Sequence, residues 1–105
     1  MTKRLPVHPG EVLRDEFLRP MNLSGGAVAR AVGVPRTRIE RVADQKMGIT
    51  ADTALRLAKF LRTTPMFWLD LQAQYDLECC RDEIGAELGK IEPVRQKRNR
   101  RERLK

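Results

Sequence analysis

Residues 25–44 carry the spacing that does most to narrow the possible folds of this chain. Within them, Ala29, Gly33, Ile39 and Val42 follow one another at intervals of four, six and three residues. A small residue lets two helices touch, a glycine permits a tight turn, and the aliphatic residues lock the second helix against the first. This spacing predicts a helix-turn-helix, although an ordinary helical hairpin would need similar residues.

The rest of the chain has the periodicity of helices rather than of strands. Apolar residues recur every three or four positions, and prolines, glycines and capping residues mark the breaks between these runs. Ser24, Thr50 and Thr64 are placed to cap helices. We therefore predict an all-α chain with helices over about residues 9–20, 24–32, 35–44, 50–61 and 65–90.

The last of these helices is longer than a small domain can cover, because a rise of 1.5 Å per residue makes it roughly 35 to 40 Å long. Its first half carries Phe67, Trp68, Leu71 and Tyr75, which can close the core. Without Lys90 at its end, this helix has six acidic residues against Arg81 alone, a net charge of −5. We expect its second half to make a contact outside the monomer through a thinner apolar stripe of Leu77, Cys80 or Arg81, Ile84, Leu88 and Ile91.

The positive charge of the chain is unevenly distributed. The formal charge is +7, but residues 90–105 contain eight basic and two acidic side chains, a net charge of +6, so the first 89 residues carry only +1. DNA binding by the folded part must therefore be argued from local patterning. We predict an N-terminal arm over residues 1–9, a folded domain over 10–91 and a basic, disordered tail over 92–105. The tail would add nonspecific DNA affinity, touch RNA or be a solvated terminus.

The local pattern that favours DNA is in the predicted helix-turn-helix. Residues 25–46 contain five basic and two acidic side chains, a net charge of +3. The outer face of the helix over residues 35–44 carries Arg36, Thr37 and Arg41, which are placed to read base edges in the major groove, because arginine can pair with guanine through two hydrogen bonds.

Other residues around this helix complete a predicted DNA interface. Arg38 lies at the margin of the outer face, and phosphate contacts would fix the register of the protein on the duplex. The alternative is a solvated face on which Glu40 and Asp44 pair with neighbouring arginines. The predicted DNA-binding residues are Ser24, Arg30, Arg36, Thr37, Arg38, Glu40, Arg41 and Lys46, of which Ser24, Arg30 and Lys46 would hold phosphates.

The sequence gives no sign of a membrane-spanning segment, a metal site or a catalytic motif. No apolar stretch approaches the roughly 20 residues that cross a bilayer, and no signal peptide is visible, so we expect a cytoplasmic protein without a membrane partner. Cys79 and Cys80 are adjacent and read as reduced helix residues. His8 is expected to pack against or cap the first helix, and Asp52 to favour the dipole of the fourth. Without a phosphate-binding glycine loop or a nucleophile motif, we expect no catalytic activity, metal or cofactor.

Four segments occur in an order and spacing shared with a known family. They are His8-Pro-Gly-Glu-Val-Leu-Arg-Asp-Glu-Phe, Gly33-Val-Pro, Gly48-Ile-Thr-Ala-Asp-Thr-Ala-Leu-Arg-Leu-Ala and Phe67-Trp-Leu-Asp-Leu-Gln-Ala-Gln-Tyr-Asp-Leu. Together they resemble the HigA antitoxins of the Xre-type helix-turn-helix class. The resemblance implies a five-helix, lambda-repressor-like domain that dimerises through its C-terminal region. It also implies binding to a palindromic operator upstream of the protein's own toxin-antitoxin genes, and inhibition of a HigB toxin, a RelE-like ribosome-dependent mRNA endonuclease.

The sequence departs from that family at two places in the helix-turn-helix. Gly25-Gly26 stands where the family commonly has a glutamine at the second position of the motif, and Asp44-Gln45 stands where an Asn-Gly turn is common. Each glycine weakens the helix start by up to about 1 kcal/mol. These changes bear on operator affinity and operator identity more than on the fold.

We interpret the sequence as a dimeric, sequence-specific DNA-binding repressor, the antitoxin of a HigBA-type pair. The first alternative is a stand-alone Xre-type regulator without a toxin. The second is a protein-interaction module in which the acidic last helix binds a basic partner and DNA binding has been lost.

Overall fold

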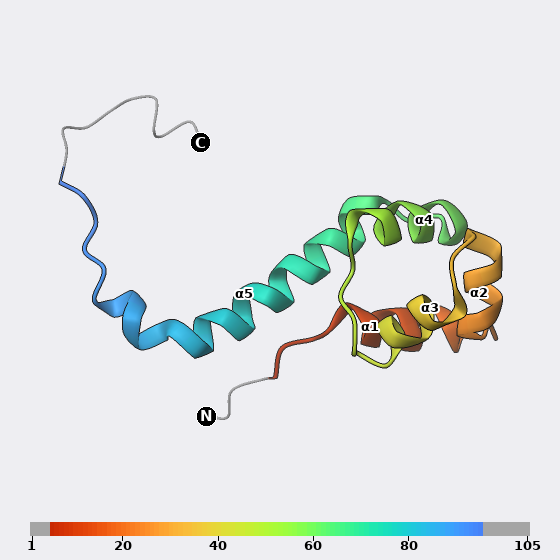
Figure 1. Cartoon of the computed structure of the whole chain (residues 1–105), viewed down its shortest axis with the longest axis horizontal. Helices are drawn as coiled ribbons and strands as arrows, with labels where there is room; N and C mark the ends of the chain where they lie inside the picture. The colour runs from red at the N-terminus through yellow and green to blue at the C-terminus, as the bar shows by residue number, and fades with distance from the viewer. Residues whose placement is uncertain (1–4, 96–105) are drawn as a thin grey trace.

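The computed structural model describes residues 5–95, which form helices joined by short turns (Figure 1). α1 (Pro9–Val12) continues directly into η1, a π-helix over Leu13–Leu18, and the other helices are α2 (Gly25–Val32), α3 (Arg36–Ala43), α4 (Ala51–Leu61) and α5 (Pro65–Gly89). With α1 and η1 taken as one helix, the described part of the chain has five helices and no strand. The predicted all-α class is confirmed.

The predicted ends of the chain lie partly outside the described residues. Residues 1–4 of the arm and residues 96–105 of the basic tail are not described, so the disordered tail stays a prediction. The division of the chain into arm, domain and tail also stays a prediction.

Three helices begin where a side-chain cap was predicted. The Ser24 Oγ accepts a hydrogen bond from the Ala27 N–H at 3.0 Å. Thr50 caps α4 in the same way through the Thr53 N–H, and Thr64 caps α5 through the Phe67 N–H. Each cap satisfies an N–H group that has no partner within the helix, which is why these local signals fix the helix starts.

The structure corrects the predicted course of two helices. Pro35 was expected as the first residue of its helix, but its extended backbone, with ψ at 144°, makes it the N-cap, and α3 begins at Arg36. One helix was predicted over about residues 9–20, and its second part is a π-helix in which the Arg19 N–H donates to the Arg14 carbonyl. The five-residue step of a π-helix matches the separation of Leu13 and Leu18, and both side chains are buried.

Trp68 is at the centre of the core. Its side chain is fully buried, its Nε1 donates to the Thr63 Oγ1 at 2.8 Å, and its ring lies 5.3 Å from the ring of Phe17. This arrangement buries the indole while satisfying its only donor. Phe67, which was expected to help close the core, is 37% exposed at the edge of this cluster.

The second half of α5 projects away from the helical domain (Figure 1). The predicted apolar stripe is exposed there, with Leu77 at 56% and Leu88 at 43%. The helix is kinked at Ile84, where φ is −112° and ψ is 16°, one residue before Gly85. Within the described chain this stripe therefore lacks a core to cover it.

Gly10 is the point at which α1 meets α3. A Cβ at residue 10 would overlap the carbonyl oxygen of Val42 and stand 2.8 Å from the carbonyl carbon. Only glycine allows the two backbones to lie so close together. This contact fixes the distance of α3 from the rest of the core.

Replacement of Gly10 by alanine should destabilise the protein strongly. Because the added methyl would meet backbone rather than a flexible side chain, α3 would have to move, at a cost of about 1–3 kcal/mol or more. Urea denaturation should show this loss. Gly85→Ala is the control, since no atom lies within 4 Å of its added Cβ, and it should be neutral or slightly stabilising. Equal stability of the two variants would contradict the α1–α3 contact.

His8 starts the first helix, as predicted. Its Nδ1 accepts a hydrogen bond from the Gly10 N–H at 2.8 Å, and its ring packs edge-on against Tyr75 with the centroids 4.8 Å apart. Burial lowers the pKa of His8 from its usual value, against a smaller opposing effect of Asp76. The folded protein therefore favours a neutral imidazole at this cap.

Mild acidification should weaken the fold through His8. Its stabilising contribution is fully present above the unfolded pKa near 6.5 and is lost as the pH falls through the lower pKa of the folded state. The free energy of unfolding, measured by urea titration, should decrease between about pH 7 and about pH 5. His8→Asn should flatten this decrease, because asparagine can cap without titrating. An unchanged pH dependence in that variant would refute the role of His8.

Candidate nucleic-acid interface

α2 and α3 form a helix-turn-helix around the residues that predicted it. Gly33 ends α2 with φ at 78°, a left-handed conformation that favours glycine, and its N–H donates to the Ala29 carbonyl at 2.8 Å. Ala29, Ile39 and Val42 are buried in the core. The chain therefore turns sharply at Gly33 and packs α3 across α2.

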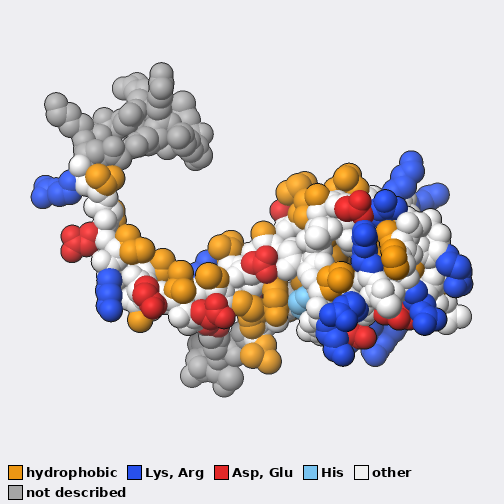
Figure 2. Space-filling view, in the orientation of Figure 1, with side chains coloured by type: hydrophobic (Ala, Val, Ile, Leu, Met, Phe, Trp, Pro, Cys, Tyr) orange, Lys and Arg blue, Asp and Glu red, His pale blue; other side chains and the backbone are white. Residues whose placement is uncertain are grey.

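The outer face of this unit is exposed and basic. Figure 2 shows Lys and Arg side chains gathered over the compact end of the molecule that contains α1 to α4. Six of the predicted DNA-binding residues are exposed, which are Ser24, Arg30, Arg36, Thr37, Arg41 and Lys46. The other two, Arg38 and Glu40, are half-buried. The structure brings the eight residues onto α2, α3 and the adjoining turns, and their contact with DNA stays a prediction.

Arg36 is held only loosely by its neighbour on α3. Its Nε lies 3.4 Å from the Glu40 Oε2, and the two side chains are 70% and 45% exposed. An exposed pair of this kind contributes little, about 0.3–0.5 kcal/mol, and is readily exchanged for another partner. The alternative of a self-paired charged face is thus right for this pair, yet the pair does not prevent Arg36 from reaching a base.

Arg38 is held much more firmly, by a residue from another helix. Its NH1 donates to the Asp52 Oδ1 of α4 at 2.6 Å, and the same oxygen accepts from the Arg56 Nε at 2.7 Å. The hydrogen bond from Arg56, and after it the one from Arg38, lowers the pKa of Asp52. Asp52 was expected only to complement the dipole of α4. Its position in the first turn of α4 suits that role, but its side chain also bridges two helices.

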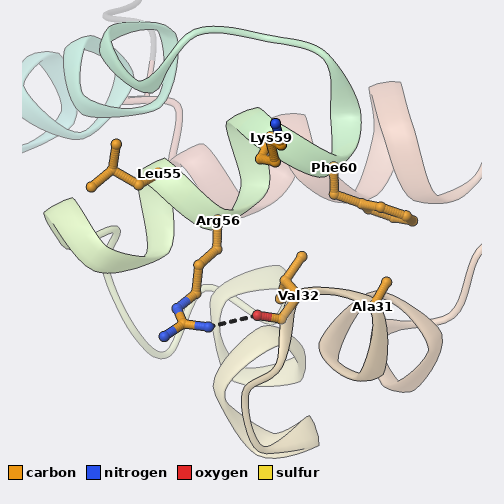
Figure 3. Close-up of a pocket in the computed structure, with 6 residues that line it drawn as sticks. All are labelled: Ala31, Val32, Leu55, Arg56, Lys59 and Phe60. Carbon is orange, nitrogen blue, oxygen red and sulfur yellow. Dashed lines mark hydrogen bonds between the residues drawn. The ribbon is translucent and has the colours of Figure 1, made fainter.

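Arg56 connects this bridge to the turn of the helix-turn-helix. Its NH1 donates to the Val32 carbonyl at 2.6 Å, as the dashed line in Figure 3 shows. The last carbonyl of α2 thereby gains a charged donor. Sequence reasoning missed Arg56 altogether, although the four-residue separation of Asp52 and Arg56 was a signal for an ion pair on one helix face.

Gly25 and Gly26 give α3 room at the start of α2. A Cβ at Gly26 would lie 3.0 Å from the Cδ of Arg36, and one at Gly25 would lie 3.0 Å from the Cγ of Glu40. The departure from the family pattern at these residues therefore has a structural consequence. The stems of Arg36 and Glu40 lie in the space that larger residues would need.

A separate groove lies between α2 and α4. Its volume is about 500 Å³, and its lining residues come from these two helices, as Figure 3 shows. They are Ala31, Val32, Leu55, Arg56, Lys59 and Phe60. The groove shares Arg56 with the bridge to Arg38 but includes no residue of the outer face of α3.

Residues 5–95 contain neither a metal-binding cluster nor a membrane-spanning helix. No group of three or more His, Cys, Asp and Glu side chains is arranged there to hold a metal ion. No helix in this part of the chain is long and apolar enough to cross a membrane. Cys79 and Cys80 are free thiols on α5.

The tight turn, the buried contact between α2 and α3 and the exposed basic face of α3 define a helix-turn-helix protein of the DNA-binding type. No protein-family model matches the chain. It is similar to antitoxin HigA-1 of Vibrio cholerae, with 39% identity over 93 residues that cover 89% of this chain and 88% of the relative. The chain belongs to the HigA family of Xre-type helix-turn-helix antitoxins, as the sequence motifs predicted.

Two solved structures of antitoxins support this assignment along nearly the whole chain. The Pseudomonas aeruginosa antitoxin HigA with higBA promoter is 38% identical, with a TM-score of 0.82 over 86% of this chain and 99% of that one. The antitoxin GraA in complex with its operator is 39% identical, with a TM-score of 0.83 over 91% of this chain and 98% of that one.

Proposed function

We propose that this protein is an antitoxin that binds the operator of its own toxin-antitoxin genes, represses them and neutralises a HigB-type mRNA endonuclease. The observation that carries this proposal is the pair of related antitoxins solved with promoter or operator DNA, which match this chain over most of its length. The protein would act in the cytoplasm and would have no catalytic activity of its own.

In this function, α3 reads bases and the start of α2 holds the backbone. Arg36 and Arg41 would donate to guanine, and Thr37 would contact a neighbouring base. The Ser24 Oγ accepts from the Ala27 N–H, so its hydroxyl hydrogen remains available to a phosphate oxygen. Arg30 and Lys46 would add charge to the same backbone contacts. Glu40 would orient Arg36, and its carboxylate would accept from a cytosine amino group in the major groove.

A palindromic operator requires two copies of α3, so the protein would act as a dimer. Half-sites one helical turn apart place the two recognition helices about 34–36 Å from each other. The exposed stripe on the second half of α5 supports dimerisation, because a second copy would cover Leu77, Ile84 and Leu88. Two-fold symmetry would then double the DNA interface.

Alanine substitution of Arg41 should reduce affinity for the operator selectively. Arg41 is exposed and forms no ion pair with the described residues, so it is free to pair with a base. Loss of one such contact should weaken operator binding by about 1–3 kcal/mol while binding to an unrelated duplex changes little. Fluorescence anisotropy with both duplexes measures the two affinities. Lys59→Ala on α4 removes one positive charge outside the predicted interface and is the control. Equal losses on both duplexes would make Arg41 a phosphate contact.

The complete function should appear in a paired assay of repression and toxicity. Expression of this protein should silence a reporter driven by its own promoter. It should also restore growth to cells that express a small basic protein from the neighbouring reading frame. Size-exclusion chromatography at micromolar concentration should give a dimer. A protein that stays monomeric and does not bind its own promoter DNA would contradict the proposal. Repression without any rescue of growth would identify a stand-alone regulator.

A further inference from the structure

The arginines of α3 differ sharply in how they are held. Arg36 faces Glu40 at 3.4 Å across one turn of the same helix and is 70% exposed. Arg38 instead donates to Asp52 of α4 at 2.6 Å and is 35% exposed. The shorter contact between two helices restrains Arg38, while Arg36 remains adjustable.

The carboxylate that holds Arg38 is itself fixed in place. Its Oδ1 also accepts from Arg56 at 2.7 Å, and Arg56 is anchored on the Val32 carbonyl at the end of α2. The chain of contacts from Val32 through Arg56 and Asp52 to Arg38 thus joins three helices. Charge-assisted bonds of this kind are among the stronger hydrogen bonds in proteins. Arg56 and, after it, Arg38 lower the pKa of Asp52 further below neutral pH, so the carboxylate that they share is ionised.

This restraint matters because a free arginine beside a DNA-reading helix binds any sequence. Phosphates are identical at every site, and each one that is neutralised releases counterions and adds about 0.9 to the slope of log affinity against log salt. Such a contact strengthens nonspecific binding as much as operator binding. A guanidinium held beside a carboxylate can reach only those phosphates that lie next to that position, and it has to give up the pair to reach any other.

We propose that Asp52 is a positioning residue, which holds Arg38 away from the DNA backbone and so keeps nonspecific affinity low. This inference rests on the proposed DNA-binding function. Asp52 acts here through Arg38 and touches no base. It removes Arg38 from the set of residues that contact DNA in the wild-type protein.

The Asp52→Asn variant of the full chain tests this role, with affinities measured for the operator and for a scrambled duplex between about 50 and 200 mM salt. Release of Arg38 should raise affinity for the scrambled duplex roughly 5- to 10-fold near 0.1 M salt and steepen its salt slope by about 0.9. Operator affinity should rise no more than this, so selectivity should not improve. A loss of affinity for both duplexes would overturn the proposal, since it would indicate a structural role alone.

The double variant Asp52→Asn/Arg38→Ala separates the release of Arg38 from the loss of a negative charge. The gain on the scrambled duplex should disappear in this background, and a gain that persists would overturn the proposal. Asp52→Glu should retain the wild-type slope, because it keeps a carboxylate for Arg38. Asp15→Asn is the matched control, since Asp15 also pairs with two arginines, Arg14 and Arg19, outside the helix-turn-helix. It should leave the slope unchanged.

A single variant provides the test if Asp52→Asn does not fold. Arg38→Ala should leave the affinity and the salt slope for the scrambled duplex at wild-type values, because Arg38 is already withheld from phosphates. A slope reduced by about 0.9 would overturn the proposal. The proposed function fails separately, if the wild-type protein binds the operator no more tightly than the scrambled duplex.

Discussion

The backbone of α1 lies directly against the Val42 carbonyl of α3, and the position of α3, the helix proposed to read DNA, depends on this contact. Gly10 permits the approach, and the His8 cap holds α1 at the depth where it occurs. Trp68 closes the core and contacts Phe17 of η1. The outer face of α3 is therefore presented by a frame of packed helices, to which the bridge from Arg38 to Asp52 and Arg56 adds a polar link.

Charge divides the molecule into two functional regions. The helix-turn-helix is positive and α5 is negative, so the two regions suit different partners. DNA is attracted to the first. The second is suited to a basic protein, and its exposed apolar stripe offers a surface that a further helix can cover. In the proposed function, this division would let the protein bind DNA and a basic toxin through separate surfaces.

Local signals made the helix starts predictable, whereas contacts between helices escaped prediction. Ser24, Thr50 and Thr64 act on N–H groups three residues away, so their sequence context was sufficient. The spacing of Ala29 and Gly33 likewise predicted the tight turn between α2 and α3. The π-helix after Val12 has no comparable sequence signal, and Pro35 was misplaced by one residue because proline suits both the cap and the first turn.

In the candidate site, too, the features set by local sequence were predicted and the contacts between helices were not. Helical periodicity was enough to place Arg36, Thr37 and Arg41 on one exposed face. The bond between Arg38 and Asp52 spans fourteen residues and depends on how α4 crosses α3, which no local pattern contains. The packing of Arg36 against Gly26 is also a contact between two helices, so local sequence did not predict it. Because the Arg36 stem occupies the space beside residue 26, a larger residue there would have to displace this side chain. In the proposed function, a change at residue 26 would therefore alter how the Arg36 guanidinium is presented to DNA.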